Sequence, residues 1–388
     1  MALGLAFEAC KKPYTPPVIV APNSYLVIEG VINSGTDSTF IKISRTVNLS
    51  AITTLAPEAG GQASVQSDAG TSYPLTEKTN GVYASAALNL NAAHKYRLAF
   101  TTSVGKQYQS DFVAVLNSPP IDSINYIITS TGLNIYANTH DPRNNTHYYR
   151  WDYQETWLIQ SDYFSYFKSN GDTVLQRDLI NDNIYTCWQS DTSSNLVLAS
   201  SAKLSQDIIS QTPILFVPSS SEKIAFRYSI GVRQYALTGD AFNFWQNLKL
   251  TSQQLGSIFS PQPSQLNGNI HSVSNTAEPV LGYISVGATS STRIFIDKTQ
   301  LPVWLTTKTY PDCMLDTFLY VYYPPFSKIP QNQVKDYINY HTSGLSSPFI
   351  PINAYGPPGK KPLGYTASTR ECVDCTVRGT NKKPAFWR

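Results

Sequence analysis

Five cysteines are the most reactive side chains in this sequence of 388 residues. Once Cys10, near the first residue, is set aside, four remain: Cys187, Cys313, Cys372 and Cys375. In an exported chain, four cysteines most simply form two disulfides, and three pairings are possible. The last two form a Cys-x-x-Cys motif, but a structural zinc site needs a second such pair or a pair of histidines. We therefore predict two disulfides of open connectivity and no metal site, with free buried thiols as the alternative.

Cys10 has a different context, because it follows a short apolar stretch and precedes two lysines and a proline-rich run. Residues 1–9 resemble the end of a bacterial lipoprotein signal peptide. The chemistry we expect is acylation of the thiol, since each buried CH₂ contributes about 0.8 kcal/mol and two or three acyl chains anchor a protein stably. Residues 13–22 suit a semi-rigid extended tether. Segment 1–23 is thus predicted to be a signal remnant, a lipidated cysteine and a tether; an idle cysteine in an extraneous tail is the alternative.

A second cluster of polar side chains lies in the stretch H-D-P-R-N-N, residues 140–145. Asp-Pro and Asn-Asn favour a turn, and loops at the end of a β-sandwich often carry function. We therefore name four candidate ligand- or partner-binding residues: His140, Asp141, Arg143 and Asn144. The alternative is that these residues only build a tight turn.

Motifs of known catalytic chemistry do not occur: there is no H-E-x-x-H, G-x-S-x-G, Walker loop or paired dinucleotide glycines. Asp152 and Glu155 supply two nearby carboxylates, as glycoside hydrolysis requires. In a β-strand, however, residues three apart point to opposite faces of the sheet. We therefore expect no catalytic residue, no cofactor and no enzyme activity, and a surface hydrolase is the least favoured reading.

The composition constrains the partner and the fold class. Charged residues make up 14%, the net charge is +3, and Lys and Arg are scattered, so a nucleic-acid partner is not expected. Aromatic residues reach 12%, and there are 25 Tyr and 25 Pro. This balance is typical of short strands joined by turns, so the fold is predicted to be mainly β. No stretch has the roughly 18 to 20 apolar residues of a membrane-spanning helix.

Two β-rich domains follow the tether. Residues 24–118 show short runs of period two separated by turn signals such as T-N-G and S-V-G, which predicts an immunoglobulin-like β-sandwich. The stretch S-P-P, residues 118–120, suits the boundary. Residues 119–388 are predicted to form a larger β-rich domain, in which residues 148–157 alternate most strongly.

One helix is expected in the second domain, near residues 238–255. Thr238 can cap its start, Gly256 marks its end, and two prolines beyond it prevent continuation. Its apolar face carries Ala241, Trp245, Leu248 and Leu255. After about residue 306 the chain is rich in Pro, Gly, Tyr and Ser, and we expect a loop-rich C-terminus.

Stretches along nearly the whole chain after residue 25 resemble, in order and spacing, the domain-of-unknown-function family 4249. They include L-V-I-E-G-V-I-N, T-H-D-P-R-N-N-T-H-Y-Y-R-W-D-Y-Q-E-T-W, Y-T-C-W, R-Y-S-I-G-V-R-Q-Y-A-L, F-W-Q-N-L, L-G-S-I-F-S-P-Q-P-S-Q-L-N-G-N-I, R-I-F-I-D and C-V-D-C-T-V-R-G-T-N-K-K-P-A-F-W. Members of this family are lipoproteins of Bacteroidota that are generally encoded next to a TonB-dependent outer-membrane receptor.

The resemblance implies a function as well as a location. It implies a non-catalytic outer-membrane lipoprotein, anchored through Cys10, that partners a TonB-dependent receptor barrel in the capture or uptake of a nutrient. It also supports pairing of the four later cysteines. Exposure at the cell surface is expected, with a periplasm-facing protein as the alternative. A structural subunit of a larger outer-membrane assembly is the alternative function.

Overall fold

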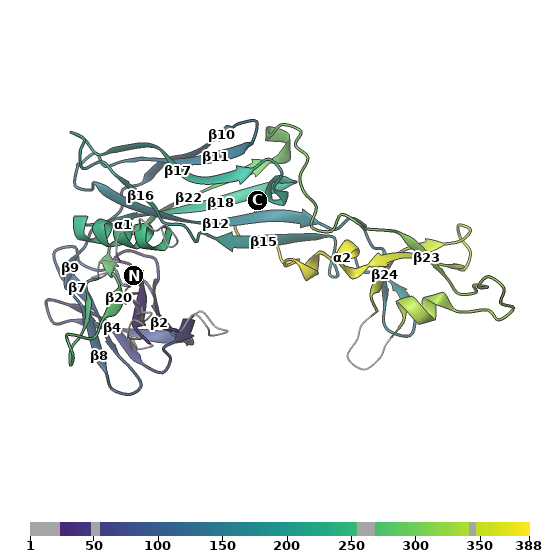
Figure 1. Cartoon of the computed structure of the whole chain (residues 1–388), viewed down its shortest axis with the longest axis horizontal. Helices are drawn as coiled ribbons and strands as arrows, with labels where there is room; N and C mark the ends of the chain where they lie inside the picture. Colours follow the sequence, from purple (N-terminus) through teal and green to yellow (C-terminus); the bar gives the residue numbers. More distant parts are fainter. Residues whose placement is uncertain (1–23, 48–54, 254–267, 341–346) are drawn as a thin grey trace, which may run out of the picture. The chain divides into compact units, whose positions relative to one another are not determined.

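The computed structural model describes residues 24–47, 55–253, 268–340 and 347–388, and the chain divides into two compact units (Figure 1). The first unit comprises Met1–Val115 and Gly256–Gly287, and the second comprises Leu116–Leu255 and Ala288–Arg388. The predicted first domain, residues 24–118, lacks the segment Gly256–Gly287, which belongs to the first unit. Cys10, the tether and the predicted helix end at Gly256 lie outside the described residues.

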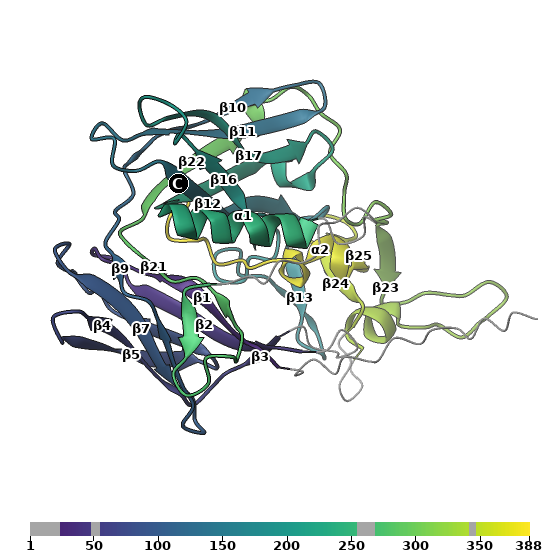
Figure 2. The same cartoon turned by 60° about the vertical axis from the view of Figure 1, so that its left-hand side comes forward.

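The first unit is a β-sandwich. Nine of its described strands follow one hydrogen-bonded path, β19-β8-β7-β4-β5-β6-β2-β1-β20, and β3, β9 and β21 pair with β2, β7 and β1 off this path (Figure 2). Apolar side chains of β1 and β7 share a single core. The strands are β1 (Leu26–Ile32), β2 (Thr39–Thr46), β3 (Leu55–Pro57), β4 (Gln62–Ser67), β5 (Ser72–Thr79), β6 (Val82–Ser85), β7 (Lys95–Thr101), β8 (Gln107–Ser110), β9 (Val113–Ala114), β19 (Ile270–Ser272), β20 (Val280–Gly282) and β21 (Ser285–Val286).

Period-two alternation explains this core. In β7, Tyr96, Leu98 and Phe100 are buried while the residues between them are half-buried. The returning segment completes the sandwich, since β19 pairs with β8 and both β20 and β21 pair with β1. The buried amide of Asn269 fixes this segment, because it accepts a hydrogen bond from Ile284 N and donates one to Ile284 O (2.8 and 2.9 Å).

The second unit contains two sheets that pack face to face (Figure 1). One has the order β10-β11-β17; the other has the order β15-β12-β18-β22, with β16 also paired to β12. The bounds are β10 (Ile121–Ile128), β11 (Gly132–His140), β12 (Tyr148–Gln160), β15 (Thr186–Thr192), β16 (Val197–Ser200), β17 (Ile208–Pro218), β18 (Arg227–Ala236) and β22 (Ser290–Asp297). Three 3₁₀ turns accompany them: η1 (Glu222–Ile224), η2 (Lys298–Gln300) and η4 (Cys375–Val377).

The aromatic strand predicted from the sequence is β12, the centre of the larger sheet. Tyr149, Trp151 and Tyr153 point into the core between the two sheets. The indole nitrogen of Trp151 donates a 2.9 Å hydrogen bond to the side chain of Gln234 on β18. Burial of the aromatic face therefore leaves this polar atom satisfied.

Helix α1 (Gly239–Gln253) lies on the opposite, outer face of the same sheet (Figure 1). The hydroxyl of Thr238 accepts a 3.2 Å hydrogen bond from Ala241 N, as expected for a helix cap. The guanidinium of Arg150 on β12 lies between the rings of Tyr235 and Trp245, 4.3 and 4.4 Å from their centroids. The predicted helix is thus confirmed, and it covers part of this sheet. Leu255 of its predicted apolar face lies outside the described residues.

The C-terminal region holds more regular structure than its loop-rich sequence suggests. A small sheet has the order β23-β25-β24, and a hairpin, β13 with β14, packs against it. The bounds are β13 (Phe167–Ser169), β14 (Val174–Gln176), β23 (Asp316–Leu319), β24 (Phe349–Tyr355), β25 (Gly364–Thr369), α2 (Arg370–Val373) and the π-helical turn η3 (Val334–Ile338). The predicted fold class is confirmed: the protein is mainly β, with a sandwich followed by a larger β-rich unit. Within the described residues, no helix has both the length and the apolarity needed to cross a bilayer.

Candidate functional site

A polar hollow of about 570 Å³ lies on the outer face of the sheet formed by β15, β12, β18 and β22. Strand alternation places every second residue of these strands on this face, away from the core. Gly231 is one of the residues that line the hollow, and most of the other side chains that line it are polar. The main ones are Asp152, Gln154, Thr192, Arg233 and Arg293.

Gly231 makes room for the guanidinium of Arg293. The two residues are paired in register between β18 and β22. A Cβ atom on residue 231 would lie 2.5 Å from Nη2 of Arg293, so a larger residue would push the guanidinium away. Arg293 donates hydrogen bonds to Ser229 Oγ (3.1 Å) and to Gln154 Oε1 (3.2 Å), which hold it over the strand.

The guanidinium of Arg293 has no acidic partner: among the described residues, no carboxylate forms an ion pair with it. Burial lowers the pKa of Arg293 from its ordinary value, and the nearby Tyr228 partly opposes this. Arginine presents a planar fork of donors that fits carboxylate and phosphate groups. A small ligand with an anionic group could therefore neutralise this charge in the hollow.

A second polar pair includes Asp152, which also lines the hollow. The hydroxyl of Tyr235 donates a 2.6 Å hydrogen bond to the carboxylate of Asp152. Burial, and then the charge of Asp152, raise the pKa of this tyrosine, so it stays a neutral donor. The hollow is thus lined by a carboxylate, Asp152, as well as by the guanidinium groups of Arg233 and Arg293.

The C-terminal residues border the hollow on the side of Arg293. The ring of Phe386 lies 3.8 Å from the guanidinium carbon of Arg293. Trp387 is buried and packs edge-to-face against Trp188 on β15 and Phe295 on β22. Helix α1 and this C-terminal segment therefore cover two parts of the outer face, and the hollow lies on the part that neither covers.

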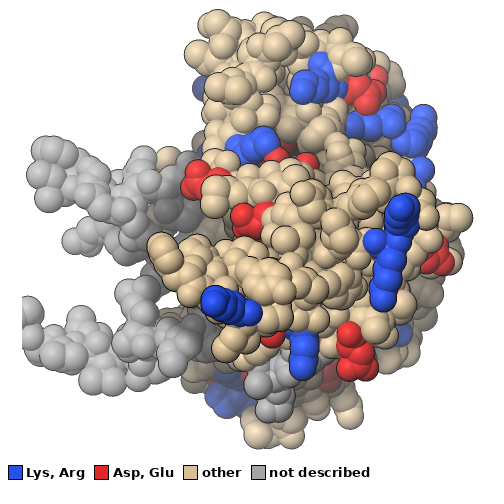
Figure 3. Space-filling view, turned by 90° about the vertical axis from the view of Figure 1, so that its right-hand side faces the viewer, with Lys and Arg blue, Asp and Glu red and all other residues tan. Residues whose placement is uncertain are grey.

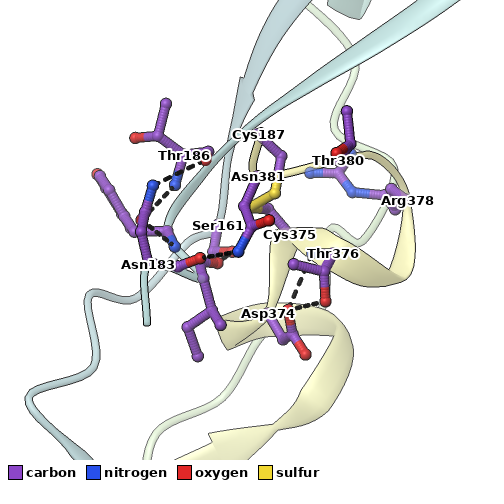
Figure 4. The surroundings of a disulfide bond; sticks show 12 residues. Ser161, Asn183, Thr186, Cys187, Asp374, Cys375, Thr376, Arg378, Thr380 and Asn381 are labelled. Carbon is purple, nitrogen blue, oxygen red and sulfur yellow. Dashed lines mark hydrogen bonds between the residues drawn. A yellow bond between two sulfur atoms is a disulfide. The ribbon is translucent and has the colours of Figure 1, made fainter. Parts of the chain in front are cut away.

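Disulfides hold the C-terminal segment in place, and the prediction of two disulfides is confirmed. Cys187 on β15 pairs with Cys375, and Cys313 pairs with Cys372. Figure 4 shows the first bridge, where the side chain of Asn381 donates a hydrogen bond to the carbonyl of Asn183 (2.7 Å). Beyond the bridge, Trp188 and Thr380 exchange two backbone hydrogen bonds, 2.8 and 3.0 Å long. The segment that ends beside Arg293 is therefore fastened to the edge strand.

The four loop residues predicted as a binding site are not in the hollow. Asp141 is buried and accepts backbone hydrogen bonds from Arg143 (3.0 Å), Asn145 (2.9 Å) and Thr146 (3.1 Å). The guanidinium of Arg143 points to solvent, with its Nε 3.9 Å from Asp141. Asn144 has a φ of 54° and accepts a 2.7 Å hydrogen bond from the backbone of Asp207. These contacts build the turn itself.

His140 belongs to a separate surface pair. Its ring nitrogen Nδ1 lies 2.8 Å from the carboxylate of Asp122, and both side chains are exposed. The hydrogen bond to Asp122 raises the pKa of His140, and the negative charge adds to the effect. The structure therefore joins Asp141 and Asn144 in one turn and leaves His140 outside it.

Asp207 is the partner that sequence reasoning missed in this turn. Its buried carboxylate accepts hydrogen bonds from the backbone of Asp141 (2.8 Å), from the hydroxyl of Tyr149 and from that of Ser201. Burial works against ionisation of Asp141, but the backbone donors of Arg143 and Asn145 outweigh it and lower the pKa of Asp141. The arrangement is a satisfied polar network under the end of β11.

The two carboxylates considered for glycoside hydrolysis lie on opposite faces of β12. Glu155 is buried and accepts hydrogen bonds from Lys223 (2.6 Å) and Tyr228 (2.7 Å), whereas Asp152 lies on the outer face. Over the described ranges, no group of three His, Cys, Asp or Glu residues is arranged to hold a metal ion.

The hollow could have been suspected from one signal in the sequence. The stretch S-I-G-V-R places a glycine between apolar residues of β18, two residues from Arg233 and on its face. Such a glycine often marks close approach of another group. The approaching group, Arg293, comes from another strand, and the sequence gives no indication of which residue that is.

The sequence matches the family described as Domain of unknown function (DUF4249) over residues 11–293. The chain belongs to this family. The DUF4249 match includes every lining residue of the hollow and ends at Arg293. No curated protein matches the sequence significantly.

Solved structures were also compared with this DUF4249 protein. A two-domain fibronectin type-III segment of chicken tenascin is 12% identical, covers 55% of this chain and 93% of its own, and has a TM-score of 0.17. Chitinase ChiA74 from Bacillus thuringiensis is 13% identical, covers 47% of this chain and 30% of its own, and has a TM-score of 0.15.

Proposed function

We propose that this DUF4249 protein is a non-catalytic, lipid-anchored binding protein of the outer membrane that partners a TonB-dependent receptor barrel. In this proposal, Cys10 carries the anchor and the hollow on the outer face of the β12 sheet holds a small polar ligand with an anionic group. The protein faces the cell exterior and brings this ligand to the barrel.

The observation that carries the ligand part is the guanidinium of Arg293. It is held by Ser229 and Gln154, lies over Gly231, and has no ion pair with a carboxylate among the described residues. A half-buried cation of this kind is stabilised when an anionic group binds to it. The membrane anchor and the receptor partner are supported by the family resemblance of the sequence.

The receptor part is tested by co-purification from detergent-solubilised outer membranes. The acylated full chain is expected to bring down a TonB-dependent barrel, identified by mass spectrometry. A Cys10→Ser chain serves as the control, because without the acyl anchor high salt should release it from the membrane fraction. If the wild-type protein is acylated and folded but never brings down such a barrel, the partnership is wrong.

The ligand part is tested by thermal unfolding against a panel of acidic sugars, amino acids and dicarboxylates. A compound that raises the unfolding temperature of the wild-type protein should have no such effect on Arg293→Gln. The matched control is Arg143→Gln, which removes an exposed guanidinium far along the chain from the hollow. Equal responses of wild type and Arg293→Gln would contradict the assignment.

A further inference from the structure

Two loops emerge side by side from one end of the small C-terminal sheet, and we call residues 320–331 and 356–363 the tip loops. The first begins where Tyr320 N donates a 2.9 Å hydrogen bond to the carbonyl of Leu363 in the second. Paired backbone hydrogen bonds between Tyr322 and Gln331 (2.9 and 2.8 Å) close the first loop at its base. The second loop is closed by the bond from Leu363 N to Tyr355 O (2.8 Å).

Large apolar side chains on the tip loops stand in solvent. Phe326 is fully exposed and Ile329 is 74% exposed. Phe326 has a φ of 66°, which is uncommon for an aromatic residue. Three further apolar side chains are more than half exposed: Val321, Tyr323 and Leu363. Exposed apolar side chains gathered in this way mark an interaction surface more often than scattered single ones do.

The charge of the tip loops has one sign. They contain Lys328, Lys360 and Lys361, all exposed, and no Asp or Glu. Figure 3 views the side on which these loops lie: uncharged side chains cover most of it, and both basic and acidic side chains are distributed over it. A partner that complements the tip loops therefore has a negatively charged outer layer with an apolar region beneath it.

The small size of the apolar surface on the tip loops favours a bilayer over a protein as the binding partner. Five apolar side chains are far fewer than the roughly 20 to 30 residues that each side contributes to a stable protein interface. A fluid bilayer needs no matching shape: it accepts apolar side chains below the headgroups, while lysine stems extend to the anionic groups. The tip loops also contain six prolines, so little conformational freedom is lost on insertion.

We propose that the tip loops are a second membrane contact, in which Phe326 and Ile329 enter an anionic lipid surface and the three lysines bind its headgroups. This contact is independent of acylation at Cys10 and of the hollow. It would fix the orientation of the small sheet against the membrane, which a lipid on a tether cannot do.

The test is vesicle co-flotation of the full chain carrying Cys10→Ser, so that no acyl chain contributes. We expect it to bind phosphatidylcholine vesicles that contain phosphatidylglycerol, and to bind pure phosphatidylcholine vesicles more weakly. Phe326→Asn with Ile329→Ser should weaken binding about tenfold or more. Asparagine suits the positive φ at residue 326, so the backbone is retained. Replacing the three lysines by glutamine should weaken binding about fivefold for each charge, and added salt should do the same.

Matched controls carry the same changes elsewhere. Val104→Ser and Lys203→Gln remove an exposed apolar side chain and an exposed lysine outside the tip loops and should bind as the wild type does. Circular dichroism and thermal unfolding check that every variant is folded. The proposal is overturned if the folded Cys10→Ser chain does not bind the anionic vesicles, or if the tip variants made in that chain bind as tightly as it does. It is also overturned if the controls lose binding equally, because the binding would then not depend on the tip loops.

Discussion

Gly231 and Arg293 occupy paired positions of β18 and β22, and the guanidinium of Arg293 fills the space that a side chain at residue 231 would take. The guanidinium of Arg293 can therefore take its position in the hollow because residue 231 has no side chain. Neither residue is informative alone, since glycine weakens a strand and an arginine on an outer face is common.

Gly231→Ala should displace Arg293 and weaken binding of an acidic ligand about tenfold, because a charge-assisted hydrogen bond contributes about 1.5 to 3 kcal/mol. The atoms displaced belong to a flexible side chain, so the protein should still fold. Isothermal titration calorimetry with the acidic compound that most stabilises the wild type measures the effect. Gly239→Ala, where the added methyl group meets only Tyr148 at 3.7 Å, is the matched control. If Gly231→Ala bound the compound with wild-type affinity, the space that Gly231 leaves for Arg293 would have no role in binding.

The two disulfides should differ in their contribution to stability. The bridge between Cys187 and Cys375 closes a sequence separation of 188 residues, and that between Cys313 and Cys372 closes 59. Chain entropy then gives about 5 kcal/mol for the first and about 4 kcal/mol for the second. Urea unfolding of the two double Cys→Ala variants measures the losses. A larger loss from the shorter loop would show that loop entropy does not set the order.

Gln234 should be sensitive to an apolar replacement. Its buried side chain accepts from Trp151 and donates to Ser118 Oγ (3.1 Å), Pro119 O (3.0 Å) and Thr139 Oγ1 (3.0 Å). Gln234→Leu leaves the indole nitrogen of Trp151 without its partner in the core, whereas Ser118 Oγ still donates to Pro119 O and Thr139 Oγ1 to Pro120 O. The expected loss is about 2 to 4 kcal/mol of unfolding free energy.

The control for this change is Gln66→Leu, which removes a half-buried amide whose hydrogen-bond partner is Arg97 on the neighbouring strand. It should cost less than about 1 kcal/mol. Denaturant unfolding compares the two variants. Equal losses would mean that the Gln234 network contributes no more than an ordinary surface hydrogen bond.

The stabilising contribution of Asp141 should be lost in acid. Its folded pKa lies below the ordinary value of 3.8, so its contribution to stability is complete above about pH 4 and is lost as the pH falls towards the folded pKa. Asp141→Asn should lower the unfolding free energy at pH 7 and reduce its fall below pH 4. Unfolding curves measured between about pH 3 and 7, a range that covers most of the titration of an aspartate, test this. An unchanged slope in the variant would show that Asp141 does not carry the acid sensitivity.

The control for the acid experiment is Asp37→Asn, a change at an exposed residue of the first unit. It should leave both the unfolding free energy at pH 7 and its decline in acid as they are in the wild type. A variant at Asp37 that matched Asp141→Asn would point to a general charge effect rather than to the buried turn.

Local pattern accounts for much of the fold. Alternating apolar residues in β7 and β12 predicted buried strands, and a threonine before an apolar face predicted the start of α1. These features depend on residues a few positions apart, whose relative directions are fixed by strand and helix geometry. Residues 268–287 were predicted to belong to the second domain, but they pair with β1 and β8 of the first unit. Local pattern could not show this, because β1 and β8 are far from these residues in the sequence.

The sequence by itself determined the mainly β class, the aromatic strand, the helix and the presence of two disulfides, since composition, periodicity and an even cysteine count are local or additive properties. Only the tertiary structure decided which cysteines pair, that Asp207 completes the turn of Asp141, and that Arg293 lies over Gly231. Those relationships follow from strand register and sheet packing. Register depends on contacts among the whole set of strands, and no single segment encodes it.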